Sequence, residues 1–233
     1  MSTNKIFCIG DGYAYGHIWP EWPQIIQALL PQYKIVLISG IGAGNEFLIS
    51  KFLELGKEIQ NQKVIFQWAD AFRFDKLVQD SSWISLGESD PVYHFNFYQS
   101  NDKNWWLSSD SQNIKVQEYH NFYIQDKQAK LRLQNQKTLV ENYLQNNQCD
   151  YYFTSTQEQM KFNNDSRFDQ LASKEIQPTP MVHFYFVVEV LLPAISITCD
   201  TDRADMLKQR IANQNWIAYD PDRIEIWQKM SIF

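Results

Sequence analysis

The chain has 233 residues, a formal net charge of -6 and an aromatic content of 15%, including eight tryptophans. This many large apolar side chains excludes intrinsic disorder, and the net negative charge disfavours a general nucleic-acid binder, which needs cations to neutralise phosphates. No apolar run approaches the ~20 residues that cross a bilayer, and the amino terminus lacks a signal-peptide pattern. We therefore expect a cytoplasmic protein with no nucleic-acid or membrane partner.

The cysteines and histidines show no metal-binding pattern. Cys8, Cys149 and Cys199 are isolated and odd in number, without the paired spacing of a zinc site or a disulfide framework. The four histidines are not gathered by any spacing typical of metal ligands either. We predict no metal and no cofactor, and we expect a reducing compartment.

The first part of the chain repeats one pattern three times, in which a short apolar run is followed by a loop and then by helical spacing. The runs at 5–9, 34–38 and 64–68 predict strands, and 22–30 and 45–55 predict helices. Continuous apolar strands separated by helices predict a parallel sheet covered on both faces. Such folds place their sites in the loops after the strands. We therefore expect the three loops that follow these strands to lie side by side.

The remaining pattern is less regular. Between about residues 80 and 115 the sequence predicts an insertion, with a strand at 92–98 and a polar excursion at 99–112. Beyond it we predict helices and short strands at 116–144 (helix), 151–153 (strand), 180–192 (helix), 200–212 (helix) and 216–227 (extended). No linker divides the chain, so we predict one three-layer α/β/α domain over 1–233 with a mostly parallel sheet.

Two glycine-rich loops follow the first two predicted strands. Asp11 follows the first strand and is flanked by glycines, including Gly12, which permit a sharp turn and a close ligand approach; the alternative is a tight turn capped by Asp11. The second loop, at 39–45, contains Gly42 and Gly44 but lacks the full dinucleotide-binding fingerprint. The amides at the start of the next helix are suited instead to an oxyanion.

Four segments in order resemble those of the SGNH or GDSL hydrolases. They are KIFCIGDGYAYG, SGIGAGNEF, VIFQWAD and EIQPTPMVHFYFVVEVLLP. The resemblance covers about the first seventy residues and about twenty near the carboxyl terminus. It implies a flavodoxin-like three-layer fold and ester hydrolysis, in which a GDS serine is the nucleophile. Residues after the second and third strands supply oxyanion donors in that superfamily, and a late DxxHP segment carries the aspartate and histidine.

The residues at the catalytic positions of that superfamily are replaced. Gly12 stands at the serine position and cannot form an acyl-enzyme. Pro178 matches the proline of the late segment, which puts Gln177 at the histidine position. Glutamine cannot take the proton of a hydroxyl nucleophile near neutral pH. Glu175 is the nearest acidic stand-in for the aspartate, and His183 matches a second histidine seen in many members.

These replacements leave three hypotheses of function. In the first, a cleft at the strand ends binds a polar small molecule, such as a carbohydrate or an acylated metabolite, without serine-esterase chemistry. The residues expected to bind it are Gly12, Tyr13, Gly42, Gly44, Asn45, Trp68, Asp70, Arg73, Glu175 and Gln177. In the second, an active esterase or acyl or glycosyl transferase uses Asp11 with His17 or His183. In the third, a structural or assembly protein has no cleft there.

The segment QWADAFRFD has two interpretations. Trp68 beside Asp70 and Arg73 predicts an aromatic platform with hydrogen-bonding charges, which suits a sugar. The alternative is that Trp68 packs under the sheet edge while Arg73 pairs with Asp75 or Asp70. His183 has a similar alternative, because a histidine on an apolar helix is more often a packed core residue than a catalyst.

Overall fold

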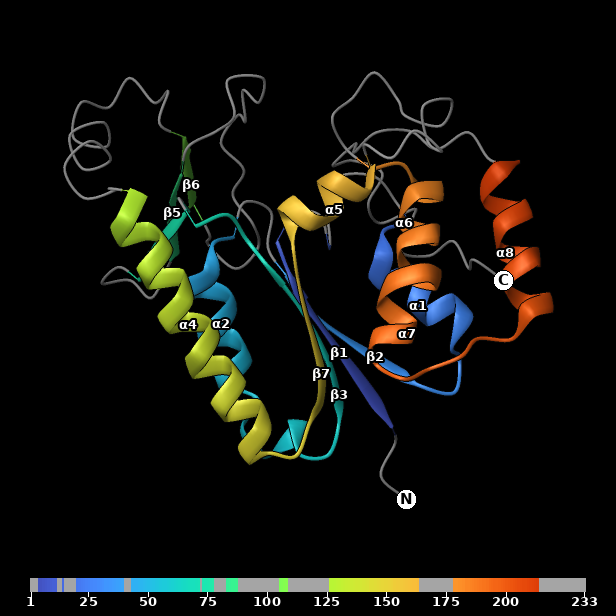
Figure 1. Ribbon diagram of the computed structural model, residues 1–233, viewed down its shortest axis with the longest axis horizontal. Coiled ribbons are helices and arrows are strands. Elements are labelled where there is room, and N and C mark those ends of the chain that lie inside the picture. Colours follow the sequence, from blue (N-terminus) through green and yellow to red (C-terminus); the bar gives the residue numbers. More distant parts are fainter. Residues whose placement is uncertain are drawn as a thin grey trace.

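Figure 1 shows a computed structural model of the chain, which describes residues 4–11, 14, 20–39, 43–71, 73–77, 83–87, 105–108, 126–163 and 178–213. The strands are β1 (Lys5–Gly10), β2 (Lys34–Ser39), β3 (Lys63–Trp68), β4 (Phe74–Leu77), β5 (Trp83–Gly87), β6 (Trp105–Ser108) and β7 (Asp150–Ser155). The α-helices are α1 (Trp22–Leu29), α2 (Asn45–Leu53), α4 (Asp126–Asn146), α5 (Thr156–Asn163), α6 (Pro180–Phe186), α7 (Leu192–Ala194) and α8 (Thr201–Ala212). A short 3-10 helix, η1 (Gly56–Ile59), precedes β3.

The main sheet has four parallel strands in the order β2-β1-β3-β7. Ile9 of β1 is in register with Ile38 of β2 and with Phe66 of β3. The carboxyl ends of the first three strands are therefore neighbours. The predicted parallel sheet is confirmed, and the fold class is α/β.

Helices cover both faces of this sheet, which gives three layers (Figure 1). Side chains of β1 alternate between the faces: Ile6 and Cys8 join a core with α1, α6 and α8, whereas Phe7 and Ile9 join a core with α2 and α4. This two-residue period is that of an extended strand. It explains why the strand reads as one continuous apolar run.

A second sheet contains three strands in the order β4-β5-β6. β4 and β5 are antiparallel, whereas β5 and β6 are parallel. The sequence predicted a polar excursion over 99–112, but Trp105–Ser108 forms β6. The strand propensity of the two tryptophans in this segment explains the difference. The predicted strand at 92–98 and the extended tail at 216–227 lie outside the described residues.

The predicted helix 180–192 is confirmed as one continuous helical segment with a change of winding. Thr179 caps α6, since its side chain accepts a hydrogen bond from the backbone amide of Val182, and Pro180 occupies the first turn, where proline is tolerated. A π-helical turn, η3 (Val187–Leu191), joins α6 to α7. In the described part of the chain, no helix combines the length and apolarity that crossing a membrane requires.

Candidate functional site

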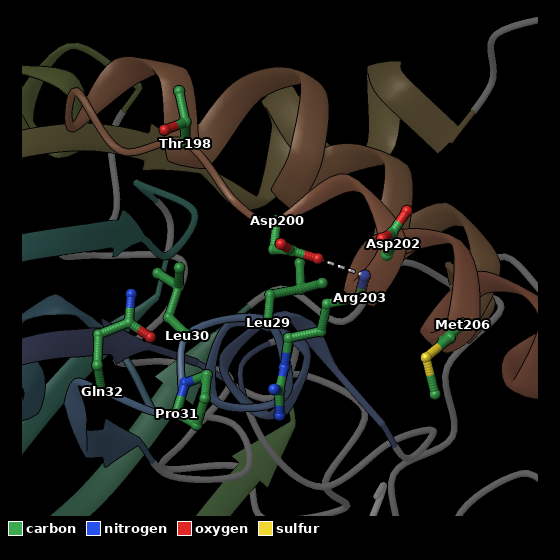
Figure 2. A pocket seen from close by; sticks show the side chains of 9 residues that line it. All are labelled: Leu29, Leu30, Pro31, Gln32, Thr198, Asp200, Asp202, Arg203 and Met206. Atoms are coloured by element: carbon green, nitrogen blue, oxygen red, sulfur yellow. Dashed lines mark hydrogen bonds between the residues drawn. The ribbon is translucent and has the colours of Figure 1, made fainter.

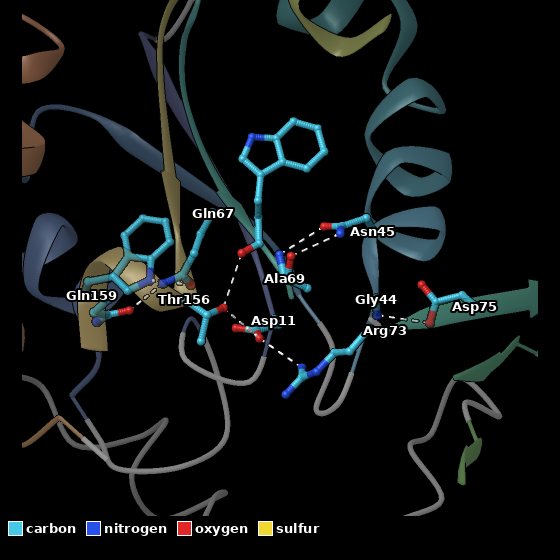
Figure 3. A network of polar contacts seen from close by, with 11 residues as sticks. Asp11, Gly44, Asn45, Gln67, Ala69, Arg73, Asp75, Thr156 and Gln159 are labelled. Carbon is cyan, nitrogen blue, oxygen red and sulfur yellow. Dashed lines mark hydrogen bonds and ion pairs between the residues drawn. The ribbon is translucent and has the colours of Figure 1, made fainter. Parts of the chain in front are cut away.

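The order of the strands indicates the edge of the sheet at which a ligand site is expected. The chain passes from β1 to β2 on one side and then to β3 on the other side of β1, so its direction of progression reverses between β1 and β3. In open α/β sheets, ligands bind at the carboxyl ends of the strands beside such a reversal. A network of polar side chains lies at this edge (Figure 3).

The centre of the network is an ion pair between Asp11 and Arg73. Nη1 of Arg73 lies 2.9 Å from Oδ2 of Asp11, and the aspartate is fully buried. The hydroxyl of Thr156, the first residue of α5, lies 3.1 Å from the same oxygen and 3.3 Å from the carbonyl oxygen of Trp68. A buried carboxylate needs such partners to offset its desolvation. Two predicted site residues, Asp11 and Arg73, are thus brought together.

Asn45 fixes the start of the loop that carries Arg73. Its Nδ2 donates to the carbonyl oxygen of Ala69 at 3.1 Å, and its Oδ1 accepts from the amide of Ala69 at 3.0 Å. Asn45 is only 2% exposed. Its amide group therefore ties the first residue of α2 to the end of β3, so both ends of this side chain are engaged by the protein itself.

Arg132, on α4, fixes the middle of the same loop. Its Nη2 donates to the carbonyl oxygens of Ala71 and Arg73, at 2.8 and 3.0 Å. Its Nε lies 3.2 Å from Oε1 of Glu46, which anchors the guanidinium in turn. Arg132 and Glu46 were not among the predicted site residues; Arg132 is one charge among many on the polar helix α4. Together they set the backbone position from which Arg73 reaches Asp11.

The carboxylate of Asp75, on β4, caps the amino terminus of α2. It accepts from the amides of Gly44 and Phe47 at 3.0 and 2.8 Å, and it is buried. A Cβ at Gly44 would lie 2.8 Å from both oxygens of this carboxylate, so glycine is needed for the close approach. An internal carboxylate thus lies beside the Gly44 amide, where negative charge is favoured, and the role of these amides in ligand binding stays a prediction.

Trp68 and Asp70 have different surroundings. The Trp68 ring is 1% exposed, stacks on Phe66 at a centroid distance of 4.3 Å and meets Phe153 edge-on at 5.4 Å. Its Nε1 has no hydrogen-bond partner among the residues that the structure describes. Trp68 thus packs as a core side chain, as the alternative interpretation expected. Asp70 is partly exposed and accepts a hydrogen bond from Nε2 of Gln157 at 3.0 Å.

His183 is a buried residue of α6 and is 2% exposed. Its Nδ1 lies 2.7 Å from Nε2 of Gln159 on α5. Gln159 accepts in turn from Nε2 of Gln67, whose Oε1 accepts from the indole of Trp22 at 3.4 Å. Neither glutamine was among the predicted site residues, although a polar residue inside the apolar run VIFQW was a usable signal.

Several predicted site residues lie outside the part of the chain that the structure describes. They are Gly12, Tyr13, His17, Gly42, Glu175 and Gln177. Their roles stay predictions. Among the described residues, no group of three or more histidine, cysteine or acidic side chains is arranged to hold a metal ion.

A pocket of about 460 Å³ lies elsewhere, beside the amino end of β2 (Figure 2). Its lining consists of Leu29, Leu30, Pro31, Gln32, Thr198, Asp200, Asp202, Arg203 and Met206. None of the predicted site residues contributes to it. Two of its polar groups are engaged internally: Asp200 caps α8, and Nε of Arg203 donates to the carbonyl oxygen of Ala28 at 2.7 Å.

Comparison with known proteins gives no identification, since no protein-family model, no curated protein and no solved structure matches the chain significantly. Function is therefore inferred from the sequence motifs and from the geometry at the carboxyl edge of the sheet.

Proposed function

We propose that this chain is a divergent SGNH-like protein that binds a polar small molecule at the carboxyl edge of its parallel sheet, without serine-esterase chemistry. The ordered motifs and the α/β fold class support the relationship. Gly12 and Gln177, at the positions of the nucleophile and the base, support the loss of hydrolysis. The ligands we favour are carbohydrates and acylated metabolites.

The ion pair between Asp11 and Arg73 carries this proposal. A buried ion pair is weak support for stability, since well-packed apolar residues in its place are often no worse. This pair lies where α/β folds bind ligands. The Arg73 side chain is 18% exposed, so it links the buried carboxylate to the surface. Because the pair as a whole is neutral, it suits a ligand that is recognised by hydrogen bonds, such as a polyol.

The rigidity of the loop that carries Arg73 is a second support. Asn45 holds Ala69 by two hydrogen bonds, and Arg132 holds the carbonyl oxygens of Ala71 and Arg73. A side chain held in place before binding loses less conformational entropy when the ligand arrives. Loops fixed in this way by neighbouring elements are typical of sites that need accurate geometry.

The contacts of His183 argue against its use as a catalytic base. In a serine triad, the base donates from Nδ1 to a carboxylate and accepts the nucleophile's proton at Nε2. Nδ1 of His183 instead faces the amide nitrogen of Gln159 at 2.7 Å. Asp11, the acid expected to partner it, bonds to Arg73 and Thr156. These contacts weigh against an active hydrolase or transferase that uses His183, whereas the alternative with His17 stays a prediction.

Calorimetric titration with glucose, mannose and N-acetylglucosamine tests the proposal. We expect at least one sugar to bind, and Arg73→Lys to weaken it about tenfold, because lysine keeps the charge but loses the planar fork of donors. The matched control is Arg210→Lys, at an exposed position of α8, which should bind like the wild type. Equal binding by wild type and Arg73→Lys would contradict a site at this ion pair.

A further inference from the structure

Four buried polar side chains form a hydrogen-bonded chain through the molecule. It runs from Trp22 on α1 through Gln67 on β3 and Gln159 on α5 to His183 on α6. Trp22, Gln67 and Gln159 are fully buried, and His183 is 2% exposed. Polar contacts inside an apolar core therefore join α1, β3, α5 and α6.

The donor-to-acceptor direction of these hydrogen bonds is fixed by Trp22, the first residue of the hydrogen-bonded chain. The indole of Trp22 can only donate, so Oε1 of Gln67 faces it and Nε2 of Gln67 faces Gln159. Gln159 then accepts at Oε1 and donates from Nε2 to Nδ1 of His183. Nδ1 must be an acceptor and carries no proton. The neutral ring therefore has its proton on Nε2.

Helix α5 connects this chain to Asp11. Thr156, which bonds to Asp11, and Gln159, which bonds to His183, lie three residues apart on α5 and so share one helix face. Gln67 also packs against the strand end that leads to Asp11, since a Cβ at Gly10 would lie 2.9 Å from its Oε1. A shift of α5 away from α6 would thus move the hydroxyl that holds Asp11.

We infer that neutral His183 ends a one-way hydrogen-bond chain that holds α5 in place, and that protonating His183 breaks the chain and loosens Thr156 at the site. Protonation puts an N–H on Nδ1, facing the N–H of Gln159. Gln159 cannot turn to accept this proton without opposing the donor of Gln67, and Gln67 cannot turn because Trp22 only donates. The claim that this protonation regulates a ligand site rests on the proposed function. The direction of the hydrogen bonds does not depend on it.

The sign of the pH effect follows from linkage. The unfolded chain protonates a histidine below about pH 6.5, whereas we expect the hydrogen-bond chain to keep the folded ring neutral. The folded state therefore loses stability as the pH falls through that value. Between pH 7.5 and 5.5, this one group raises the unfolding equilibrium constant about tenfold.

Other charged groups lie on the elements packed against α6. Among the described residues they are Glu21 before α1, Glu158 and Lys161 on α5, Glu189 on η3, and Asp202, Arg203, Asp205, Lys208 and Arg210 on α8. Glu158 accepts hydrogen bonds from Tyr152 and Thr154, and Lys208 lies over the ring of Tyr185. Ordinary carboxylates titrate near pH 4 and lysines above pH 10. The variants are therefore compared at pH 7.5 and 5.5, between the ordinary titration ranges of carboxylates and lysines.

Nitrogen-15 NMR of the histidine rings tests the direction of the chain. We expect His183 to show the tautomer protonated at Nε2 at pH 7.5 and to stay neutral where exposed histidines titrate. Single variants His17→Gln, His94→Gln and His120→Gln identify the other three ring signals, so the assignment does not require altering His183. A proton on Nδ1, or titration near pH 6.5, would overturn the inference.

Two tryptophan variants test the mechanism. Trp22→Phe removes the donor that fixes the direction, so both glutamines can turn and accept the proton of a charged His183. We expect its unfolding constant to change clearly less than that of wild type between pH 7.5 and 5.5. Trp68→Phe is the matched control, since Trp68 is equally buried but outside the chain, and it should keep the wild-type dependence.

Equal pH dependence in all three proteins would overturn the inference and leave the proposed function intact. Conversely, failure of every sugar to bind would count against the proposed function. The NMR and stability measurements would still test the hydrogen-bond chain that ends at His183.

Discussion

Arg73 and Asp11, 62 residues apart in sequence, form an ion pair of 2.9 Å that joins the loop after β3 to the end of β1. The two partners are unequal, because the Asp11 side chain is fully buried while that of Arg73 is 18% exposed. Loss of one partner therefore has a different consequence from loss of the other.

Arg73→Gln should destabilise the protein more than Asp11→Asn. Removing Arg73 takes away the cation that pairs with a fully buried carboxylate, and breaking a buried pair in this way costs about 3 kcal/mol or more. Removing the anion leaves a guanidinium that can reach water, so we expect about 1–2 kcal/mol. Urea unfolding of the two variants measures the difference.

The control for that pair is Lys51→Gln. Lys51 lies 3.1 Å from Glu54, and both side chains are exposed, at 41% and 61%. Exposed pairs contribute about 0–1 kcal/mol. If Asp11→Asn cost as much as Arg73→Gln, the proposed asymmetry of the buried pair would be wrong.

Asn45→Ala should cost about 2–3 kcal/mol in the free energy of unfolding. It leaves both the amide and the carbonyl oxygen of Ala69 buried without their partner, and each such loss costs about 1–3 kcal/mol. Asn135→Ala, at an exposed position of α4, should be nearly neutral. The expectation fails if the two variants unfold at the same urea concentration.

Asp75→Ala should destabilise α2 from its amino end. The carboxylate accepts from two amides of the first turn, those of Gly44 and Phe47, and losing such a cap costs about 1–2 kcal/mol. Hydrogen exchange should become faster at both amides. Asp202→Ala, in the exposed first turn of α8, is the control and should leave exchange in α2 unchanged.

Burial of the Cys8 thiol raises its pKa above the ordinary value of 9.0. The folded state therefore disfavours the thiolate, and the stability held below pH 9 is lost as the pH rises above it. At pH 10.5 we expect a loss of about 2 kcal/mol from this group.

Cys8→Ala should reduce that alkaline loss, measured by urea unfolding at pH 7 and 10.5 with reductant. Tyr152, whose pKa is raised to about 12 by burial and by Glu158, titrates in both proteins and so cancels in the comparison. Identical alkaline losses in the two proteins would show that Cys8 is not the source.

The sheet could be predicted because its signal is local. Most residues of a strand buried on both faces are apolar, so β1, β2 and β3 stand out as short apolar runs. Trp68 also had a local signal, since it shares a face with the core residue Phe66 two positions earlier.

The partners within the site could not be predicted, because they come from distant segments. Asp11 and Arg73 were each selected from their own loops, but nothing in the sequence paired them. Arg132 lies on a polar helix, where a charge that binds a loop looks like a solvated one. Asp75 caps a helix 28 residues before it, whereas caps recognisable from sequence lie next to their helix.

Binding without acyl-enzyme chemistry is tested most directly by stopped-flow mixing of the protein with p-nitrophenyl acetate. With Gly12 at the nucleophile position, we predict no burst of p-nitrophenol and a release rate equal to that of buffer. A burst stoichiometric with protein, abolished by a serine-directed phosphonate, would contradict the proposed function.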